Sequence, residues 1–485
     1  MAIIKADKQG DLSVFLSSTA SGQKRYMEKR RIGMKKSLSL KETIFVASML
    51  FGMFFGAGNL IFPVSMGQLA GRNMWSAAAG FLITGVGLPL LGVAALGVSR
   101  KAGLLELSSI AGRRYGLFFT CALYLTIGPF FAIPRCATVS FAVGLERFLP
   151  EGGGTLALPV FSLLFFAVVL FFSLRPGEIL TWIGKVLNPL FLCFLGILII
   201  RALVSPMGEI AGSSPEAAYA SQPFFKGFLE GYNTMDALAG LAFGIVIVNV
   251  IRGLGVEQEN AVAANTVRAG IFSSVLMAAI YLLVTAVGAQ SRGCFPASAN
   301  GGTALAQIAE HYFGSAGAVI LAVTVTMACL KTAVGLITSC GATFERMFSR
   351  GPSYRVWAVL FCVLSFLIAN LGLNAIIGCS MPVLMFLYPL AVTLILLTLF
   401  GRFFSYDRSV YRWVTGCTAV AAAVDFCNAL PKGIASALHM EGAARAAAEA
   451  IPFAEQGFGW VCPAAAGLVI GLVFRAVKAG KRKDM

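Results

Sequence analysis

Charged residues are scarce in this sequence. Asp, Glu, Lys and Arg make up 12% of its 485 residues and hydrophobic residues make up 58%, whereas about 25% of the residues of an average soluble protein are charged. So little charge cannot cover the surface of a soluble fold of this size, and no stretch of the chain reads as a soluble domain. Apolar runs of about 20 residues, long enough to cross a bilayer, recur along the whole length.

Residues with catalytic or metal-binding chemistry are also few. The chain has two histidines, His311 and His439, both in predicted outer loops, and it contains no HExxH, GxSxG or GxxxxGK[ST] motif. Its 11 cysteines form no CxxC pair and lie mostly within apolar runs, so we expect free thiols packed among apolar side chains. These absences argue against an enzyme, against a metal or disulfide framework and against ATP-driven transport.

The apolar runs predict about twelve transmembrane helices. Their expected ranges are 40–70 (broken), 76–98, 115–145, 156–173, 179–204, 224–251 (broken), 265–288, 314–344, 355–372, 380–401, 410–429 and 457–477. With the N-terminus inside, 29 of the 38 Lys and Arg residues fall in inner segments and seven in outer ones. This bias follows the positive-inside rule and predicts that both termini are cytoplasmic. The net charge of +16 then reflects orientation in a bilayer, and the basic run 24–36 fits attraction to anionic lipid better than binding to nucleic acid.

A glycine-rich break interrupts the first apolar run. Residues 52–63 read GMFFGAGNLIFP, and the glycines, Asn59 and Pro63 in this segment are expected to unwind the helix near the middle of the membrane. Unwound backbone is costly in hydrocarbon unless it lines a cavity or finds other partners. In secondary transporters such breaks hold the substrate and the coupling ion, so the segment predicts a carrier of a small solute. A glycine-packed helix crossing is the alternative interpretation.

The sixth run contains a second break, GYNTMDALAG (231–240). A charge at the bilayer centre costs about 2.5–3.5 kcal/mol on insertion scales, so Asp236 is expected to face a cavity or a partner. A solvated helix end is the alternative for this residue. The two broken runs stand five spans apart, and because five is odd the second copy enters from the opposite side. This topology predicts an inverted repeat in which the first five spans match the next five.

The expected organisation has four parts. They are a cytoplasmic N-terminal arm (1–37), a first repeat (38–205), a second repeat (224–401), and a region with two appended spans and a basic tail (402–485). The stretch 303–313 and the alanine-rich segment 430–456 are predicted to form surface helices.

Six segments carry a pattern that is specific when taken together. They are GAGNLIFP (56–63), FLITGVGLPLLGVAALG (81–97), GPFFAIPRCATVSFAVG (128–144), GYNTMDALAGLAFGIVIVNVIR (231–252), ACLKTAVGLITSC (328–340) and AEQGFGW (454–460). In this order they resemble the bacterial branched-chain amino acid carriers of the amino acid-polyamine-cation superfamily, from about residue 40 to residue 477. The resemblance implies an all-α fold with a five-plus-five inverted repeat and a multi-pass position in the bacterial inner membrane. It also implies uptake of leucine, isoleucine and valine coupled to sodium, with a proton-coupled or sodium-independent permease as the alternative.

The first break is a candidate site for the substrate carboxylate. Gly56, Ala57, Gly58 and Asn59 would present free N–H groups and the positive end of a half-helix to an anion. The side chain of Asn59 could bind either a cation or the substrate.

The second break is a candidate site for the substrate ammonium or a cation, through Tyr232, Thr234 and Asp236. An aliphatic substrate also needs an apolar wall, since one methylene contributes only about 1–3 kcal/mol to specificity. The expected wall residues are Tyr124, Phe130, Ile133 and Phe243.

Coupling is expected to involve the eighth span. The resemblance implies that Thr332 binds sodium together with the carbonyl oxygens of Gly52 and Phe55, which are hard ligands of the kind such a cation prefers. Lys331 stands beside Thr332, and its ammonium could occupy a cation site. Sodium is therefore only modestly favoured over protons, and a lysine that snorkels into the inner vestibule is the alternative.

Arg135 lies within the third span, where an arginine must snorkel, pair or line water. Snorkelling is the favoured interpretation, and pairing with Asp236 the other. A channel would need a repeated filter or a charged ring, and neither is visible. The sequence does not predict an oligomeric state.

Overall fold

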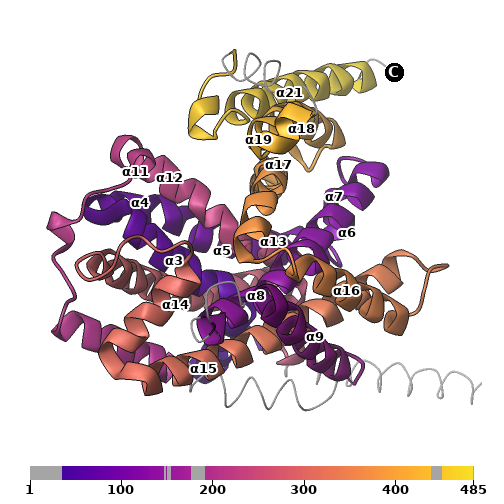
Figure 1. Cartoon of the computed structure of the whole chain (residues 1–485). Coiled ribbons are helices and arrows are strands. Elements are labelled where there is room, and N and C mark those ends of the chain that lie inside the picture. Colours follow the sequence, from indigo (N-terminus) through magenta and orange to yellow (C-terminus); the bar gives the residue numbers. More distant parts are fainter. Residues whose placement is uncertain (1–34, 147–148, 150–153, 176–191, 438–449, 484–485) are drawn as a thin grey trace, which may run out of the picture.

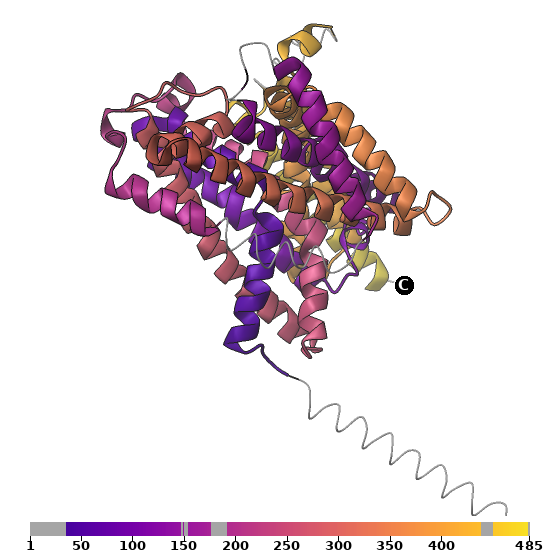
Figure 2. The ribbon, with the colours of Figure 1, turned by 60° about the horizontal axis from the view of Figure 1, so that its bottom comes forward.

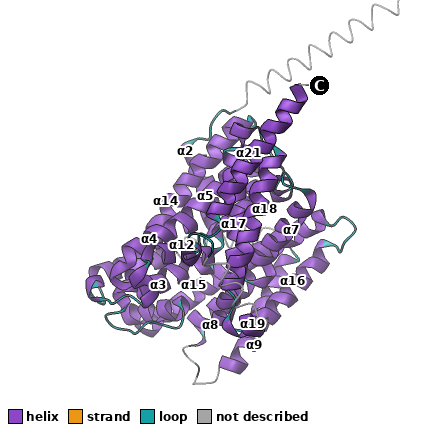
Figure 3. Ribbon diagram, turned by 90° about the horizontal axis from the view of Figure 1, so that it is seen from above, coloured by secondary structure: helices purple, strands orange, loops and turns teal. Residues whose placement is uncertain are grey.

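The computed structural model describes residues 35–146, 149, 154–175, 192–437 and 450–483. Within these ranges the chain is helical, with no strand (Figure 1; Figure 3). The predicted all-α fold is confirmed. The N-terminal arm up to residue 34, and residues 438–449 of the predicted 430–456 surface helix, lie outside the described residues. The described helical parts of that segment are α19 (Lys432–Ala437) and the 3-10 turn η8 (Ala454–Gln456).

The first broken helix consists of α2 (Leu40–Phe54) and α3 (Ala57–Ala70). The start of α2 is capped reciprocally, because Ser39 and Glu42 each accept a hydrogen bond from the backbone N–H of the other. The break itself is confined to Phe55 and Gly56, both extended. The unwound stretch predicted within residues 52–63 was therefore too long. Gly52 and Gly58, Asn59 and Pro63 are helical. Pro63 lies inside α3, where its ring removes one backbone hydrogen bond of the helix.

The second broken helix consists of α12 (Pro223–Glu230), the 3-10 turn η6 (Gly231–Thr234) and α13 (Asp236–Gly253). Met235 joins the turn to α13 in the left-handed conformation, with φ of 62°. The break, predicted over 231–240, is thus shorter on its C-terminal side. Asp236 begins α13, a position where a negative side chain interacts favourably with the helix dipole.

The remaining helices follow in chain order. They are α4 (Met74–Leu82), the π-turn η2 (Ile83–Gly87), α5 (Leu88–Ser99), α6 (Leu104–Ser108), α7 (Arg113–Leu125), the π-turn η3 (Thr126–Phe130), α8 (Ala132–Gly144), α9 (Gly154–Ser173), a helix over Leu192–Val204, α11 (Ala217–Ser221), α14 (Glu259–Ser291), α15 (Gly301–Met347), α16 (Tyr354–Ala369), α17 (Leu373–Leu399), α18 (Arg408–Asn428) and α21 (Val461–Lys483).

Helix α15 contains the predicted surface helix 303–313. It bends at Gly314, whose φ of 59° and ψ of −159° are not helical. The segment before this glycine is thereby separated from the membrane-spanning part that follows it, as expected.

Helix packing follows the symmetry of an inverted repeat. The broken first span packs on α14, the seventh span, while the broken sixth span packs on α4 and α5, which form the second span (Figure 2 shows α2 beside α14). If the first span corresponds to the sixth and the second to the seventh, the repeat symmetry converts the first of these pairings into the second. The third span (α8) packs on the eighth (α15), and the fourth (α9) on the ninth (α16), and the same correspondence maps each of these pairs onto itself.

Glycines bring the symmetry-related helix pairs into close contact. A Cβ atom on Gly227 would lie 1.9 Å from the carbonyl oxygen of Ala77, and one on Gly288 would lie 2.3 Å from that of Val64. Only a residue without a side chain allows such backbones to approach, and small residues at helix crossings are characteristic of membrane bundles.

By length and apolar composition, eight described helices could cross a membrane, and two shorter apolar helices cover 192–204 and 354–369. One of these eight, Ala57–Ser99, is a continuous helical stretch that contains both the second half of the first span and the second span. Helix α18, the predicted eleventh span, is not among the eight, since charged residues such as Arg412 and Asp425 lower its hydropathy. It packs with α17 and α21 at one end of the view in Figure 1.

The eleven cysteines are all free, as predicted. Cys136, Cys329, Cys340 and Cys362 are buried, whereas Cys193 and some others lie on the protein surface.

Candidate functional site

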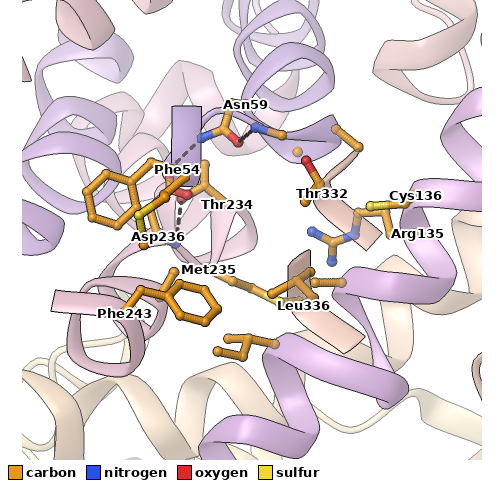
Figure 4. A pocket seen from close by; sticks show the side chains of 17 residues that line it. Phe54, Asn59, Arg135, Cys136, Thr234, Met235, Asp236, Phe243, Thr332 and Leu336 are labelled. Atoms are coloured by element: carbon orange, nitrogen blue, oxygen red, sulfur yellow. Dashed lines mark hydrogen bonds between the residues drawn. The ribbon is translucent and has the colours of Figure 1, made fainter. Parts of the chain in front are cut away.

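A central cavity of about 50 Å³ lies where the two helix breaks meet. It is lined from the first break by Gly56, Ala57, Gly58 and Asn59, from the second by Thr234, Met235 and Asp236, and from α15 by Thr332 (Figure 4). The two breaks were predicted to face one cavity, and they do.

A closed hydrogen-bond triad forms one wall of this cavity. The Asn59 side-chain amide donates to the Asp236 Oδ2 atom at 2.5 Å and to the Tyr281 hydroxyl, and that hydroxyl donates to the same Oδ2 atom at 3.2 Å. Asp236 is 2% exposed, so the alternative of a solvated helix end is wrong. Buried charge requires such partners, because an unpaired carboxylate away from water is very costly.

Tyr281, on the seventh span, was missed by the sequence analysis. It is fully buried and stands 45 residues from Asp236 and 222 from Asn59. A tyrosine within an apolar span whose hydroxyl needs a partner was the available signal, and it was too general to select this residue.

Asn59 also shapes the first break. Its Oδ1 atom accepts the backbone N–H of Gly56 at 2.8 Å. In a continuous helix that N–H would bond to the carbonyl of Gly52. The break therefore leaves the Gly52 carbonyl at the negative end of α2, where a cation is favourable.

Lys331 uses this carbonyl. Its Nζ atom donates to the Gly52 oxygen at 2.9 Å, the same oxygen that was predicted to bind sodium. The Lys331 side chain therefore reaches the last turn of α2. The Thr332 hydroxyl donates to the Ala328 carbonyl in its own helix at 3.0 Å and lines the cavity next to Gly56.

Arg135 does not snorkel. It is 2% exposed and lines the cavity from α8. Its guanidinium donates to the Asn233 carbonyl at 2.5 Å and to the Ser380 hydroxyl at 3.2 Å, and lies 4.9 Å from the centre of the Phe62 ring. The alternative interpretation was an ion pair between Arg135 and Asp236. Arg135 forms no such pair among the described residues.

Two predicted binding residues lie outside the cavity lining. The Tyr124 hydroxyl donates to the Ala242 carbonyl at 3.0 Å. Tyr232 is fully buried and stacks on Tyr388 with ring centroids 3.9 Å apart. Tyr124 thereby joins α7 to α13, and Tyr232 packs η6 on α17.

The apolar wall was predicted only in part. Phe243 lines the cavity, whereas Phe130 and Ile133 do not. The other apolar lining residues, which the sequence analysis did not single out, are Met53, Phe54, Ile127, Ala132, Ala239 and Leu336. A small cavity with one polar and one apolar wall suits a small amphiphilic solute.

Comparison with known proteins identifies relatives over nearly the whole chain. Residues 39–478 match the family described as branched-chain amino acid transport protein. The branched-chain amino acid permease BrnQ of Lactobacillus delbrueckii subsp. lactis is 49% identical over 450 residues, which cover 93% of this chain and 100% of that protein. BrnQ of Bacillus subtilis is 42% identical, covering 91% and 98%. The branched-chain amino acid transport system 2 carrier protein of Pseudomonas aeruginosa is 41% identical, covering 88% and 94%.

The fold has a solved counterpart. Mhp1, a nucleobase-cation-symport-1 family transporter, in a closed conformation with bromovinylhydantoin bound, superimposes with a TM-score of 0.59 at 15% identity, covering 90% of this chain and 93% of that chain. Its inward-facing conformation gives 0.56 over 86% and 94%. At this identity the likeness concerns the fold alone.

Proposed function

The chain belongs to the branched-chain amino acid transport protein family, and from this premise we propose that it imports leucine, isoleucine and valine together with a cation. The transport path runs through the central cavity, in a bacterial inner membrane with both termini cytoplasmic. The observation that carries the proposal is the meeting of the two helix breaks at a buried carboxylate, Asp236, in a cavity that the apolar side chain of Phe243 also lines. A carboxylate suits the substrate ammonium, and the apolar wall suits its aliphatic side chain.

Uptake of labelled leucine into proteoliposomes tests this function. We expect saturable uptake that isoleucine and valine inhibit competitively and that lysine and glutamate leave unchanged. Uptake that is insensitive to isoleucine and valine would contradict the proposal. Relatives named permeases support transport rather than catalysis.

Substitution of Gly58 tests where the substrate lies. A Cβ atom at Gly58 would lie 3.3 Å from the Phe62 ring, so Gly58→Leu fills the cavity beside the first break. We expect loss of leucine binding in a protein that still folds. Gly335→Leu is the matched control, since nothing lies within 4 Å of a Cβ there. Normal leucine uptake by the Gly58 variant would place the substrate elsewhere.

The coupling cation has two candidates. Thr332 beside the first break supports sodium, whereas the Lys331 ammonium on the Gly52 carbonyl supports protons. A protonated amine at the negative end of α2 supplies the charge that a sodium ion would otherwise bring. We therefore propose that Lys331 replaces sodium.

Variants of Lys331 distinguish the two candidates when leucine uptake is measured over a sodium series and a pH series. The parent protein should be insensitive to sodium. Lys331→Ala should reduce uptake and flatten its pH dependence, Lys331→Thr should gain a response to sodium, and Lys331→Arg, which keeps the charge, serves as the control. Full sodium dependence in the parent and in Lys331→Ala would instead establish ordinary sodium symport.

A further inference from the structure

Arg135 is a buried cation with incomplete pairing. Two of its nitrogens donate to neutral oxygens, those of Asn233 and Ser380. Its Nε atom is buried and has no hydrogen-bond partner among the described residues. The ion pairs in the same part of the chain join other residues, Lys35 with Glu42 and Arg100 with Glu259. Glu230 acts on Arg135 electrostatically but forms no ion pair with it there.

Asp236 is a buried anion that also has no charged partner among the described residues. Its partners Asn59 and Tyr281 are neutral, and it also lacks an ion pair within the described part of the chain. Arg135 and Asp236 line the same cavity from opposite sides (Figure 4). The cavity therefore has one cationic and one anionic wall.

Burial of these two charges is energetically unfavourable unless a ligand pairs with them. Each buried charge without an opposite partner loses several kcal/mol of solvation, and ionisable residues inside membrane proteins usually mark a substrate or ion pathway. An amino acid zwitterion carries the two missing charges, on groups attached to one carbon atom.

We propose that Arg135 binds the α-carboxylate of the transported amino acid through its Nε–H group while Asp236 binds the ammonium group. This assignment rests on the proposed function and adds the group that recognises the carboxylate. The start of α3 alone is a weaker anion site, because the Asn59 side chain already accepts the Gly56 N–H. A guanidinium supplies a full charge and a charge-assisted hydrogen bond in its place.

A purely structural role for Arg135 makes a different prediction. Through Asn233 and Ser380 the guanidinium links η6 to α17. If that link were its only role, its loss would weaken the binding of all ligands equally. A carboxylate-binding role affects only ligands that carry a carboxylate.

The test compares leucine with leucinamide, which keeps the ammonium group and the side chain but has no carboxylate. Binding to the purified full-length protein is measured by displacement of labelled leucine, or by direct calorimetry where leucine no longer binds. Wild type should prefer leucine by at least about tenfold, the effect of one charged hydrogen bond. In Arg135→Gln this preference should fall to within about threefold, through weaker leucine binding with leucinamide unchanged.

Ser380→Ala is the matched control, because it removes one structural partner of Arg135 and leaves the charge in place; it should keep the wild-type preference. If Arg135→Gln does not fold, Arg135→Lys takes its place, and its preference should also fall since lysine has no Nε–H group at that position. An unchanged preference in either variant overturns the assignment. Failure of wild type to bind any branched-chain amino acid would instead overturn the proposed function.

Discussion

Asp236 illustrates how a single charged residue is kept in the middle of a membrane protein. Its Oδ2 atom receives hydrogen bonds from Asn59 and Tyr281, and its position at the start of α13 adds the helix dipole. The backbone N–H of Asp236 in turn donates to the Thr234 hydroxyl at 3.3 Å. The carboxylate is therefore held in one orientation, with one wall of the cavity built around it.

Removing the Tyr281 hydroxyl should weaken this orientation. We expect Tyr281→Phe to reduce leucine affinity about tenfold, the loss of one hydrogen bond to a charged group. Titration calorimetry on the purified protein measures the change. Tyr219→Phe is the control, since the hydroxyl of Tyr219 is buried with no hydrogen-bond partner among the described residues. Equal affinities of wild type and Tyr281→Phe would show that the triad does not hold the site.

At the scale of elements, the site depends on helices that cross without side chains between them. Gly227 of α12 contacts the backbone of α4, and Gly288 of α14 contacts that of α3. Each contact fixes one broken helix against an unbroken neighbour. The breaks therefore face each other because their flanking half-helices are held at glycine crossings.

A methyl group at such a crossing should be destabilising. Gly227→Ala places a Cβ 1.9 Å from the Ala77 carbonyl, and overpacking of this kind costs about 1–3 kcal/mol. The melting temperature in detergent should fall. Gly335→Ala has no contact to make and should be neutral or stabilising by up to about 1 kcal/mol, as alanine is a better helix former. A Gly227 variant as stable as wild type would mean that the helices separate freely.

At the scale of the whole molecule, the cavity is too small for the proposed substrate. Its volume of about 50 Å³ corresponds to a few water molecules, at roughly 10–15 Å³ each. Binding of leucine therefore requires helices around the cavity to move apart. The third and eighth spans, which pack on each other and line the cavity through Cys136 and Thr332, are among those that must adjust.

Cys136 can report this movement, because it lines the cavity and is 2% exposed. In a variant that keeps Cys136 as its only cysteine, a small methanethiosulfonate reagent should react slowly, and saturating leucine should slow the reaction further. A matching variant that keeps only Cys379, which is exposed, should react quickly at the same rate with and without leucine. Leucine-independent labelling of Cys136 would argue against substrate binding in this cavity.

The helical class, most of the spans, the two breaks and the inverted topology could be predicted from the sequence. Each depends on local composition, since a run of apolar residues must be helical in hydrocarbon and glycines with polar residues interrupt it within a few positions. Even so, the predicted breaks were longer than the observed ones, because Asn59 and Asp236 bond to each other from the first turns of α3 and α13, a tertiary contact.

The partners of the charged residues could not be predicted. The Asn59–Asp236 contact spans 177 residues and the Lys331–Gly52 contact spans 279. A helix in a membrane can be apolar on every side, so its sequence carries little information about which face meets the protein interior. Arg135 could be assigned to the lipid interface or to the cavity on the same evidence. Only the packing of α8 against α15 turns it inward, where the proposed substrate would meet it.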